Sequence, residues 1–146
     1  MILSILCTLF FTSCQKDGTQ SQTTISNPVS FNMDNRKMEF SNVKVSTTEF
    51  CGQLYHSIQA YKQDYTEVFL ISIITDLGVE LKPQIYSDTA SVGCNYFTGY
   101  SQGKSTYLNV NLTTVRDSTV IQGTFNGKML YQGKLVNITN GIIDVK

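Results

Sequence analysis

The side chains that carry out acid–base or nucleophilic chemistry in enzymes are sparse in this chain. His56 is the only histidine, and it alternates with Leu54, Ile58 and Ala60, which favours a structural histidine over a catalytic one. The eleven Asp and Glu residues form no recognisable pair, and the nucleophile-elbow, zinc-protease and phosphate-loop motifs are missing. We therefore expect no catalytic residues, no metal and no cofactor, and a hydrolase is the least favoured class of function.

Tyrosine offers a softer chemistry, because an exposed ring can stack on a sugar while its hydroxyl forms hydrogen bonds. Four tyrosines lie beside hydroxyl or amide side chains in two predicted strands: Tyr55 and Tyr61 in one, Tyr96 and Tyr100 in the other. These four are the candidate glycan-binding residues. The alternative is that they serve only as favourable strand residues.

The N-terminal segment predicts secretion and attachment to a membrane. Residues 1–11 form an uncharged apolar run, which ends at Thr12-Ser13-Cys14. About ten apolar residues are too few to span a bilayer but match the core of a signal peptide. The small residues before the cysteine resemble the lipobox of bacterial lipoproteins. That resemblance implies that residues 1–13 are removed and that Cys14 becomes the lipidated N-terminus; an ordinary secretory signal is the alternative.

Two further stretches are similar to small lipoproteins of Bacteroidetes that have no assigned reaction or ligand. One is Gln15-Lys16-Asp17, directly after the cysteine. The other is the ending GTFNGKMLYQGKLVNITNGIIDVK, with matching residues Gly123, Phe125, Gly133, Lys134, Ile138, Thr139, Asn140, Gly141, Asp144 and Val145. The resemblance implies lipid anchoring at the outer membrane, on either the cell surface or the periplasmic face. It also marks Thr89 and Ser118, each preceded by an Asp, as candidate O-glycosylation sites.

Composition limits the classes of partner and the chemistry that we expect of the cysteines. Eleven basic and eleven acidic residues cancel, and charged residues make up only 15% of the chain, so nothing indicates a nucleic-acid partner. Removal of Cys7 with the signal and lipidation of Cys14 would leave Cys51 and Cys94. In an oxidising compartment these two either form one disulfide or remain two separate buried thiols.

The rest of the chain reads as strands and turns. Residues 15–28 are polar and predict a flexible tether with a reach of roughly 20 Å, so the folded domain should cover residues 29–146. Two-residue alternation is clear over residues 53–62 and 106–114, whereas residues 67–75 are apolar on both faces. No segment has a helical period. The pattern predicts an all-β fold. The spacing of strand and turn segments predicts eight to ten short strands, arranged as an antiparallel sandwich or a barrel-like meander.

Turn residues predict the details of the last strands. Asp34-Asn35 and Gln132-Gly133 are expected to be hairpin turns, and Asn140-Gly141 is expected to join residues 135–139 to a closing strand. Asn126-Gly127 either forms a turn or lies inside a strand at a bulge, and the continuous alternation favours the bulge.

These features predict a lipid-anchored, non-enzymatic module of the cell envelope. Its partners would be the membrane, through Cys14, and a glycan or an envelope protein. A structural or assembly accessory without a small ligand is the alternative.

Overall fold

The computed structural model describes residues 23–25, 29–117 and 119–146, and the secondary structure in these ranges consists of β-strands and turns. The strands are β1 (Thr23–Ile25), β2 (Val29–Met33), β3 (Arg36–Phe40), β4 (Asn42–Phe50), β5 (Gln53–Tyr61), β6 (Glu67–Asp76), β7 (Ile85–Tyr86), β8 (Val92–Thr98), β9 (Ser101–Arg116), β10 (Val120–Tyr131) and β11 (Lys134–Val145). The all-β antiparallel fold expected from the sequence is therefore confirmed. In the described ranges no helix has the length and hydropathy that crossing a membrane requires.

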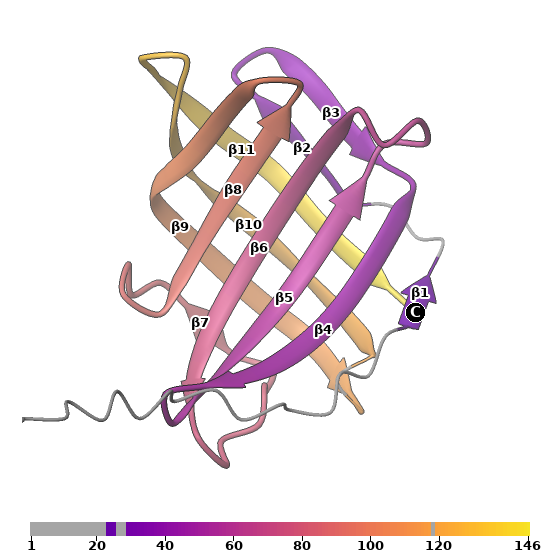
Figure 1. Ribbon diagram of the computed structural model, residues 1–146, viewed down its shortest axis with the longest axis vertical. Helices are drawn as coiled ribbons and strands as arrows, with labels where there is room; N and C mark the ends of the chain where they lie inside the picture. The colour runs from indigo at the N-terminus through magenta and orange to yellow at the C-terminus, as the bar shows by residue number, and fades with distance from the viewer. Residues whose placement is uncertain (1–22, 26–28, 118) are drawn as a thin grey trace, which may run out of the picture.

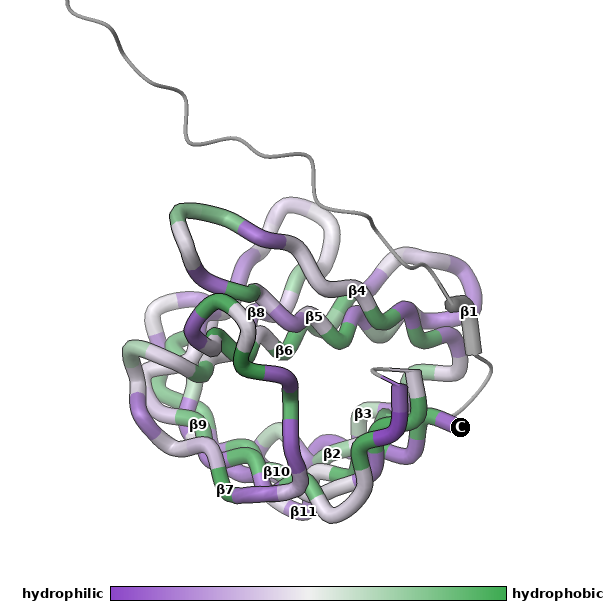
Figure 2. Tube along the Cα trace, turned by 90° about the horizontal axis from the view of Figure 1, so that it is seen from below, coloured by the Kyte–Doolittle hydropathy of each residue, from purple (hydrophilic) through white to green (hydrophobic). Residues whose placement is uncertain are grey.

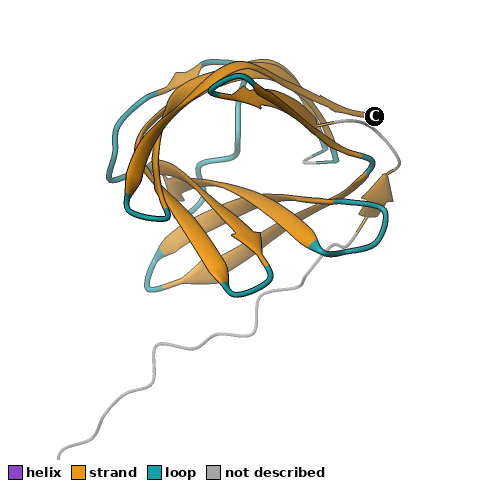
Figure 3. Cartoon of the chain, turned by 90° about the horizontal axis from the view of Figure 1, so that it is seen from above, coloured by secondary structure: helices purple, strands orange, loops and turns teal. Residues whose placement is uncertain are grey.

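A single curled sheet contains all of these strands. Its order is β1-β4-β5-β6-β8-β9-β10-β11-β2-β3, with β7 paired to β9 outside this path, and every pairing is antiparallel. Because most neighbours in the sheet are neighbours in the chain, β4 to β11 form a meander. The sheet curls into a half-barrel, so that β4, β5, β6 and β8 face a second wall of β9, β10, β11, β2 and β3 (Figures 1 and 3).

The chain itself crosses the open side of the half-barrel. β3 is one edge of the sheet and ends at Phe40, whereas β4 lies near the other edge and begins at Asn42. Ser41 separates these two strands, and the chain passes there from one wall to the other. The apolar side chains of Phe40 and Val43, on either side of this break, are both buried. Their burial is what favours a corner here over a straight strand.

The core lies between the two walls. Along β5, Ile58 and Ala60 point inward while Tyr55, Ser57 and Gln59 alternate with them on the outer face, and Figure 2 shows the same alternation of hydrophobic and hydrophilic residues in both walls. The centre of the core is a group of phenylalanines. Phe31 lies 4.4 Å from Phe69 between ring centroids, and Phe125 lies 5.7 Å and 5.5 Å from these two. These contacts join the walls.

Most of the predicted turns are confirmed. Asp34 has a positive φ in the β2–β3 hairpin, and Gln132 and Gly133 both have positive φ in the β10–β11 hairpin, as a two-residue hairpin turn of the favoured type requires. Asn126-Gly127 lies inside β10, where the register with β11 shifts between Phe125 and Gly127, so the bulge was the correct alternative.

The turn predicted at Asn140-Gly141 is wrong. β11 continues through both residues, and its register with β2 shifts between Thr139 and Ile142. Asn140 has a φ of 52°, which places the left-handed residue of a bulge where the sequence suggested a hairpin. Asparagine tolerates this conformation in both contexts, so its presence does not distinguish a turn from a bulge.

β1 lies within the segment for which the sequence predicts a flexible tether. Thr23–Ile25 pairs with Val43–Val45 of β4 and extends the sheet at that edge. Cys14, whose lipidation the sequence predicts, and the proposed signal of residues 1–13 lie outside the described residues, as does Ser118.

Candidate functional site

The main irregularity of the sheet is a split between β8 and β9. The two strands pair only from Asn95–Lys104 to Thr98–Ser101, although both continue well beyond this ladder. Further along β9, pairing on the same side resumes with β7 at Val110. Among the described strands, none pairs with residues 105–109 of β9 on this side. The split therefore opens the outer surface of the sheet.

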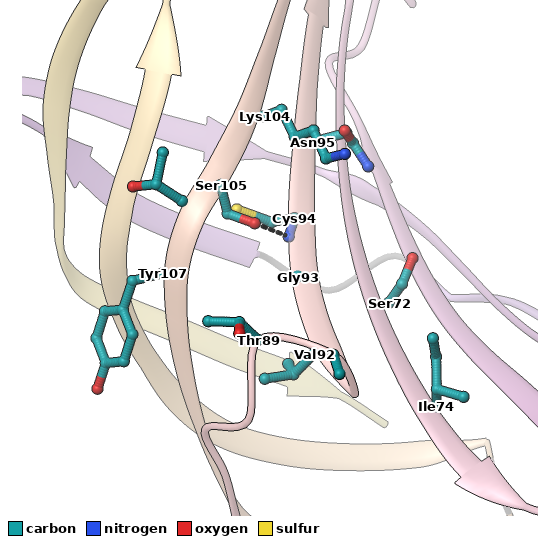
Figure 4. Close-up of a pocket in the computed structure, with 12 residues that line it drawn as sticks. Ser72, Ile74, Thr89, Val92, Gly93, Cys94, Asn95, Lys104, Ser105 and Tyr107 are labelled. Carbon is teal, nitrogen blue, oxygen red and sulfur yellow. Dashed lines mark hydrogen bonds between the residues drawn. The ribbon is translucent and has the colours of Figure 1, made fainter.

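A cleft of about 180 Å³ occupies the split. Figure 4 shows Asn95 and Lys104 at one end, and Thr89 and Val92 at the other. Ser72 and Ile74 of β6 form one side, and Tyr107 of β9 lies on the opposite side. We call this the β8–β9 cleft. Its polar groups are hydroxyls, one amide and one ammonium, which suit the recognition of hydroxyl-rich ligands.

Gly93 provides the space at the floor of the cleft. Across the outer face of the wall, Ser46, Ser57, Ser72 and Gly93 lie in register on successive strands. A Cβ atom at Gly93 would lie 3.2 Å from the Ser105 hydroxyl, a close contact but not one with backbone. Because Gly93 has no side chain, no β8 side chain fills the space between this row of small residues and β9.

Ser105 supplies a side-chain hydrogen bond where backbone pairing between β8 and β9 has ended. Its Oγ accepts a hydrogen bond from the backbone N–H of Cys94 at 2.8 Å, drawn in Figure 4. The Cys94 side chain is buried beneath, and burial raises the pKa of its thiol to about 12, partly offset by the hydrogen bond with Ser105. The thiol is therefore protonated at neutral pH and is a packing group without nucleophilic character.

The two cysteines do not form the disulfide that the sequence left open. Cys94 pairs with Ile71, which pairs with Ile58, whereas Cys51 lies in the exposed turn before β5. Gln53, the first residue of β5, is five residues from Ile58, so the two cysteines are separated by roughly 17 Å along the strand direction. A disulfide needs Cα atoms within about 7 Å.

The structure does not bring the four candidate tyrosines together. Tyr55 and Tyr61 share the outer face of β5, as predicted, but Tyr96 and Tyr100 do not share a face. Tyr96 is only 1% exposed, and its hydroxyl donates to Glu67, with which Arg36 and Lys62 form salt bridges. Burial and this carboxylate raise the pKa of Tyr96 far above its usual value. Tyr100 is fully exposed in the β8–β9 turn, because the strand ends before it.

Thr89 lies beside the cleft in the exposed loop that precedes β8. The preceding Asp88 accepts hydrogen bonds from the Ala90 N–H at 3.1 Å and the Ser91 hydroxyl at 3.0 Å, which hold the loop in a turn. Thr89 is thus accessible, and its glycosylation stays a prediction.

His56 is buried in the sheet, and its hydrogen bonds define its tautomer. The Thr75 hydroxyl donates to the Val79 carbonyl at 2.7 Å, so its oxygen accepts from Nε2 of His56 at 3.0 Å. Nδ1 of His56 then accepts from the Thr47 hydroxyl at 3.0 Å. Desolvation lowers the pKa of this buried imidazole below its ordinary value, which favours the neutral form.

The free energy of unfolding should therefore fall as the pH is lowered through the ordinary histidine pKa of about 6.5. Below that pH the unfolded chain binds a proton that folded His56 resists, so stability is complete above about pH 6.5 and decreases toward the lower folded pKa. Urea unfolding between pH 7 and pH 5 tests this, and His56→Gln should remove the dependence. An equal slope in the variant would assign it to other groups.

Within the described ranges, no three residues among His, Cys, Asp and Glu lie close enough together to hold a metal ion. In comparisons with known proteins, no family model matches the chain, and neither a curated protein nor a solved structure matches it. The geometry of the cleft is accordingly the basis for a functional proposal.

Tyr107 and Lys104 both line the cleft, and neither was among the candidate site residues predicted from the sequence. The signal for Tyr107 was present, because it alternates with buried Leu108 and precedes Asn109 and Asn111 on the polar face of the predicted strand. No local signal marks the split itself, because it arises where two strands diverge.

Proposed function

We propose that this protein is a lipid-anchored glycan-binding module of the cell envelope, attached through Cys14 and binding sugar in the β8–β9 cleft. The observation that carries the binding site is the open cleft itself, with Tyr107 on one side and Gly93 at the floor. Its small volume suits one sugar ring at a time. Ser72, Asn95 and Ser105 supply hydroxyl and amide groups that can exchange hydrogen bonds with sugar hydroxyls.

Filling the floor of the cleft should abolish glycan binding. Gly93→Leu places a branched side chain in the cleft, and since φ at Gly93 lies outside the left-handed region the backbone accepts it. On a glycan array, binding by the full-length protein should fall at least about tenfold, the loss of roughly 1.4 kcal/mol. Ser46→Leu adds a similar side chain to the same row three strands away and should bind normally.

Ser72→Leu fills the cleft from β6 instead of from β8, and it guards against a folding defect in Gly93→Leu. If both stable variants bind as well as the parent, the cleft is not the site. If the parent binds no glycan, the protein is better explained as an assembly accessory.

The anchor is tested separately. Cys14→Ala should prevent lipid labelling and move the protein from the membrane to the soluble fraction, because a short apolar run alone does not hold a mature chain in a bilayer. A parent protein that fractionates with membranes without incorporating lipid would contradict the lipoprotein assignment.

A further inference from the structure

Tyr107 belongs to two depressions, not one. On its far side lies a shallow groove of about 420 Å³ on the outer face of β9, β10 and β11, lined by Tyr107, Asn126, Gly127, Lys128, Asn137, Ile138, Thr139 and Asn140. We call this the amide groove. Tyr107 is the residue that lines both it and the β8–β9 cleft. A ligand seated in the cleft can therefore continue over this ring into the groove.

The strand register gives the length of this path. Lys104 precedes Tyr107 by three residues on β9, and Tyr107 pairs with Lys128, which pairs with Asn137. With ordinary strand rise and spacing, the path from Lys104 to Asn137 is roughly 20 Å. That is longer than one sugar ring and indicates an oligosaccharide.

Tyr107 is suited to the centre of the path. Its side chain is 41% exposed, so the ring is available for stacking. The amide nitrogen of Asn109 lies 3.5 Å from its hydroxyl and helps to position the ring. Gly127 also lines the groove, and β9 approaches it so closely that a Cβ there would lie 2.3 Å from the Tyr107 carbonyl oxygen.

Charge identifies the class of ligand. Each depression is lined by one lysine, Lys104 or Lys128, and neither is lined by Asp or Glu. Neither lysine has a salt bridge to a residue that the structure describes. A further depression, lined by Asp76 and Asp88, shares Ile74 and Ala90 with the cleft, so carboxylates lie beyond the Thr89 end of the cleft, away from Lys104.

One carboxylate lies near the end of the path. Asp34 accepts hydrogen bonds from the backbone N–H of Asn137 at 2.8 Å and from its side-chain amide at 3.4 Å. This directs the NH₂ group of Asn137 toward Asp34, so its carbonyl oxygen is left for ligand hydroxyls. The positive charge is thus concentrated between Lys104 and Lys128, on both sides of Tyr107.

We infer that the ligand is an acidic oligosaccharide, with uronic-acid carboxylates near Lys104 and Lys128 and a sugar ring against Tyr107. This inference rests on the proposed function and names its substrate class. Amides and a tyrosine ring favour a carbohydrate over other polyanions, because they recognise hydroxyls and the apolar face of a sugar.

The experiment compares two probes that differ only in charge: an oligogalacturonate and the same oligosaccharide with its carboxyl groups reduced to alcohols. Calorimetry with the full-length protein should show at least about tenfold tighter binding of the acidic form, as expected for charge-assisted hydrogen bonds. Lys104→Met and Lys128→Met should each lower this ratio several-fold, and added salt should lower it further. Lys44→Met, on the outer face of β4 in the other wall, is the matched control and should preserve the ratio.

Each contrary result has a distinct meaning. Equal binding of both probes by the parent would overturn the acidic class while leaving glycan binding in place. An unchanged ratio in Lys128→Met would confine the ligand to the cleft. Equal affinity for duplex DNA or for vesicles of anionic lipid would indicate a general anionic surface and overturn the inference. If neither probe binds but the array identifies another glycan, the acidic class fails and the proposed function stands.

Discussion

A Phe69→Ala variant should lose about 3–5 kcal/mol of unfolding free energy, the largest effect that we expect from a single substitution. Phe69 is fully buried on β6, and its ring lies 4.4 Å from Phe31, 5.5 Å from Phe125 and 6.1 Å from Phe40. These partners belong to the opposite wall, so truncation both removes apolar burial and leaves a cavity where the two walls meet.

Urea unfolding monitored by circular dichroism measures this loss. Phe97→Ala is the matched control, because Phe97 lies on the outer face of neighbouring β8 and is 37% exposed, so it should cost about 1 kcal/mol or less. If Phe69→Ala does not fold, Phe69→Leu replaces it in the comparison. Because Leu leaves a smaller cavity, its loss of unfolding free energy should be smaller than the loss expected for Ala but larger than that of Phe97→Ala. Equal midpoints for Phe69→Ala and Phe97→Ala would mean that the aromatic group does not hold the walls together.

The second large effect is expected at Gly141, where Ala should cost about 3 kcal/mol. The residue is buried inside β11, and a Cβ atom would lie 2.4 Å from the Phe125 carbonyl oxygen and 2.5 Å from the Phe125 ring. No rotamer relieves a contact with backbone, so β10 and β11 would have to separate. The melting temperature should fall on the order of 10 °C.

Gly133→Ala separates this steric effect from conformational strain. Gly133 has a φ of +75° and nothing near the added Cβ, so its substitution carries only the left-handed penalty of about 1–2 kcal/mol. If Gly141→Ala melts at the parent temperature, the close approach of β10 and β11 is not as tight as described.

The Gly141 prediction also shows where sequence reasoning succeeds and fails. The sequence indicated that this glycine is required, but for a turn, whereas the structure requires it because Phe125 packs directly above it. Two-residue alternation predicted β5 and most of β9, since such alternation follows directly from strand geometry, and a stretch that is apolar on both faces predicted β6. Asn140 was misread because a left-handed asparagine serves hairpins and bulges equally.

The candidate site was harder to predict than the strands. Tyr96 and Tyr100 have the spacing of one strand face, but β8 ends at Thr98, so Tyr100 enters a turn while Tyr96 enters the core. The cleft depends on the divergence of β8 from β9 and on a missing side chain at Gly93. The divergence, and the place of Gly93 beside it, follow from strand pairing between separate segments. Local residue patterns do not encode such pairing.

The position of the β2–β3 hairpin has a consequence for how the chain folds. β2 pairs with β11, and Asp34 contacts Asn137, which is 103 positions further along the sequence. During synthesis the hairpin emerges well before β11, so the meander from β4 onward can assemble while one edge of β2 waits unpaired. High contact order of this kind slows folding. Late closure would expose an edge prone to aggregation until β11 arrives.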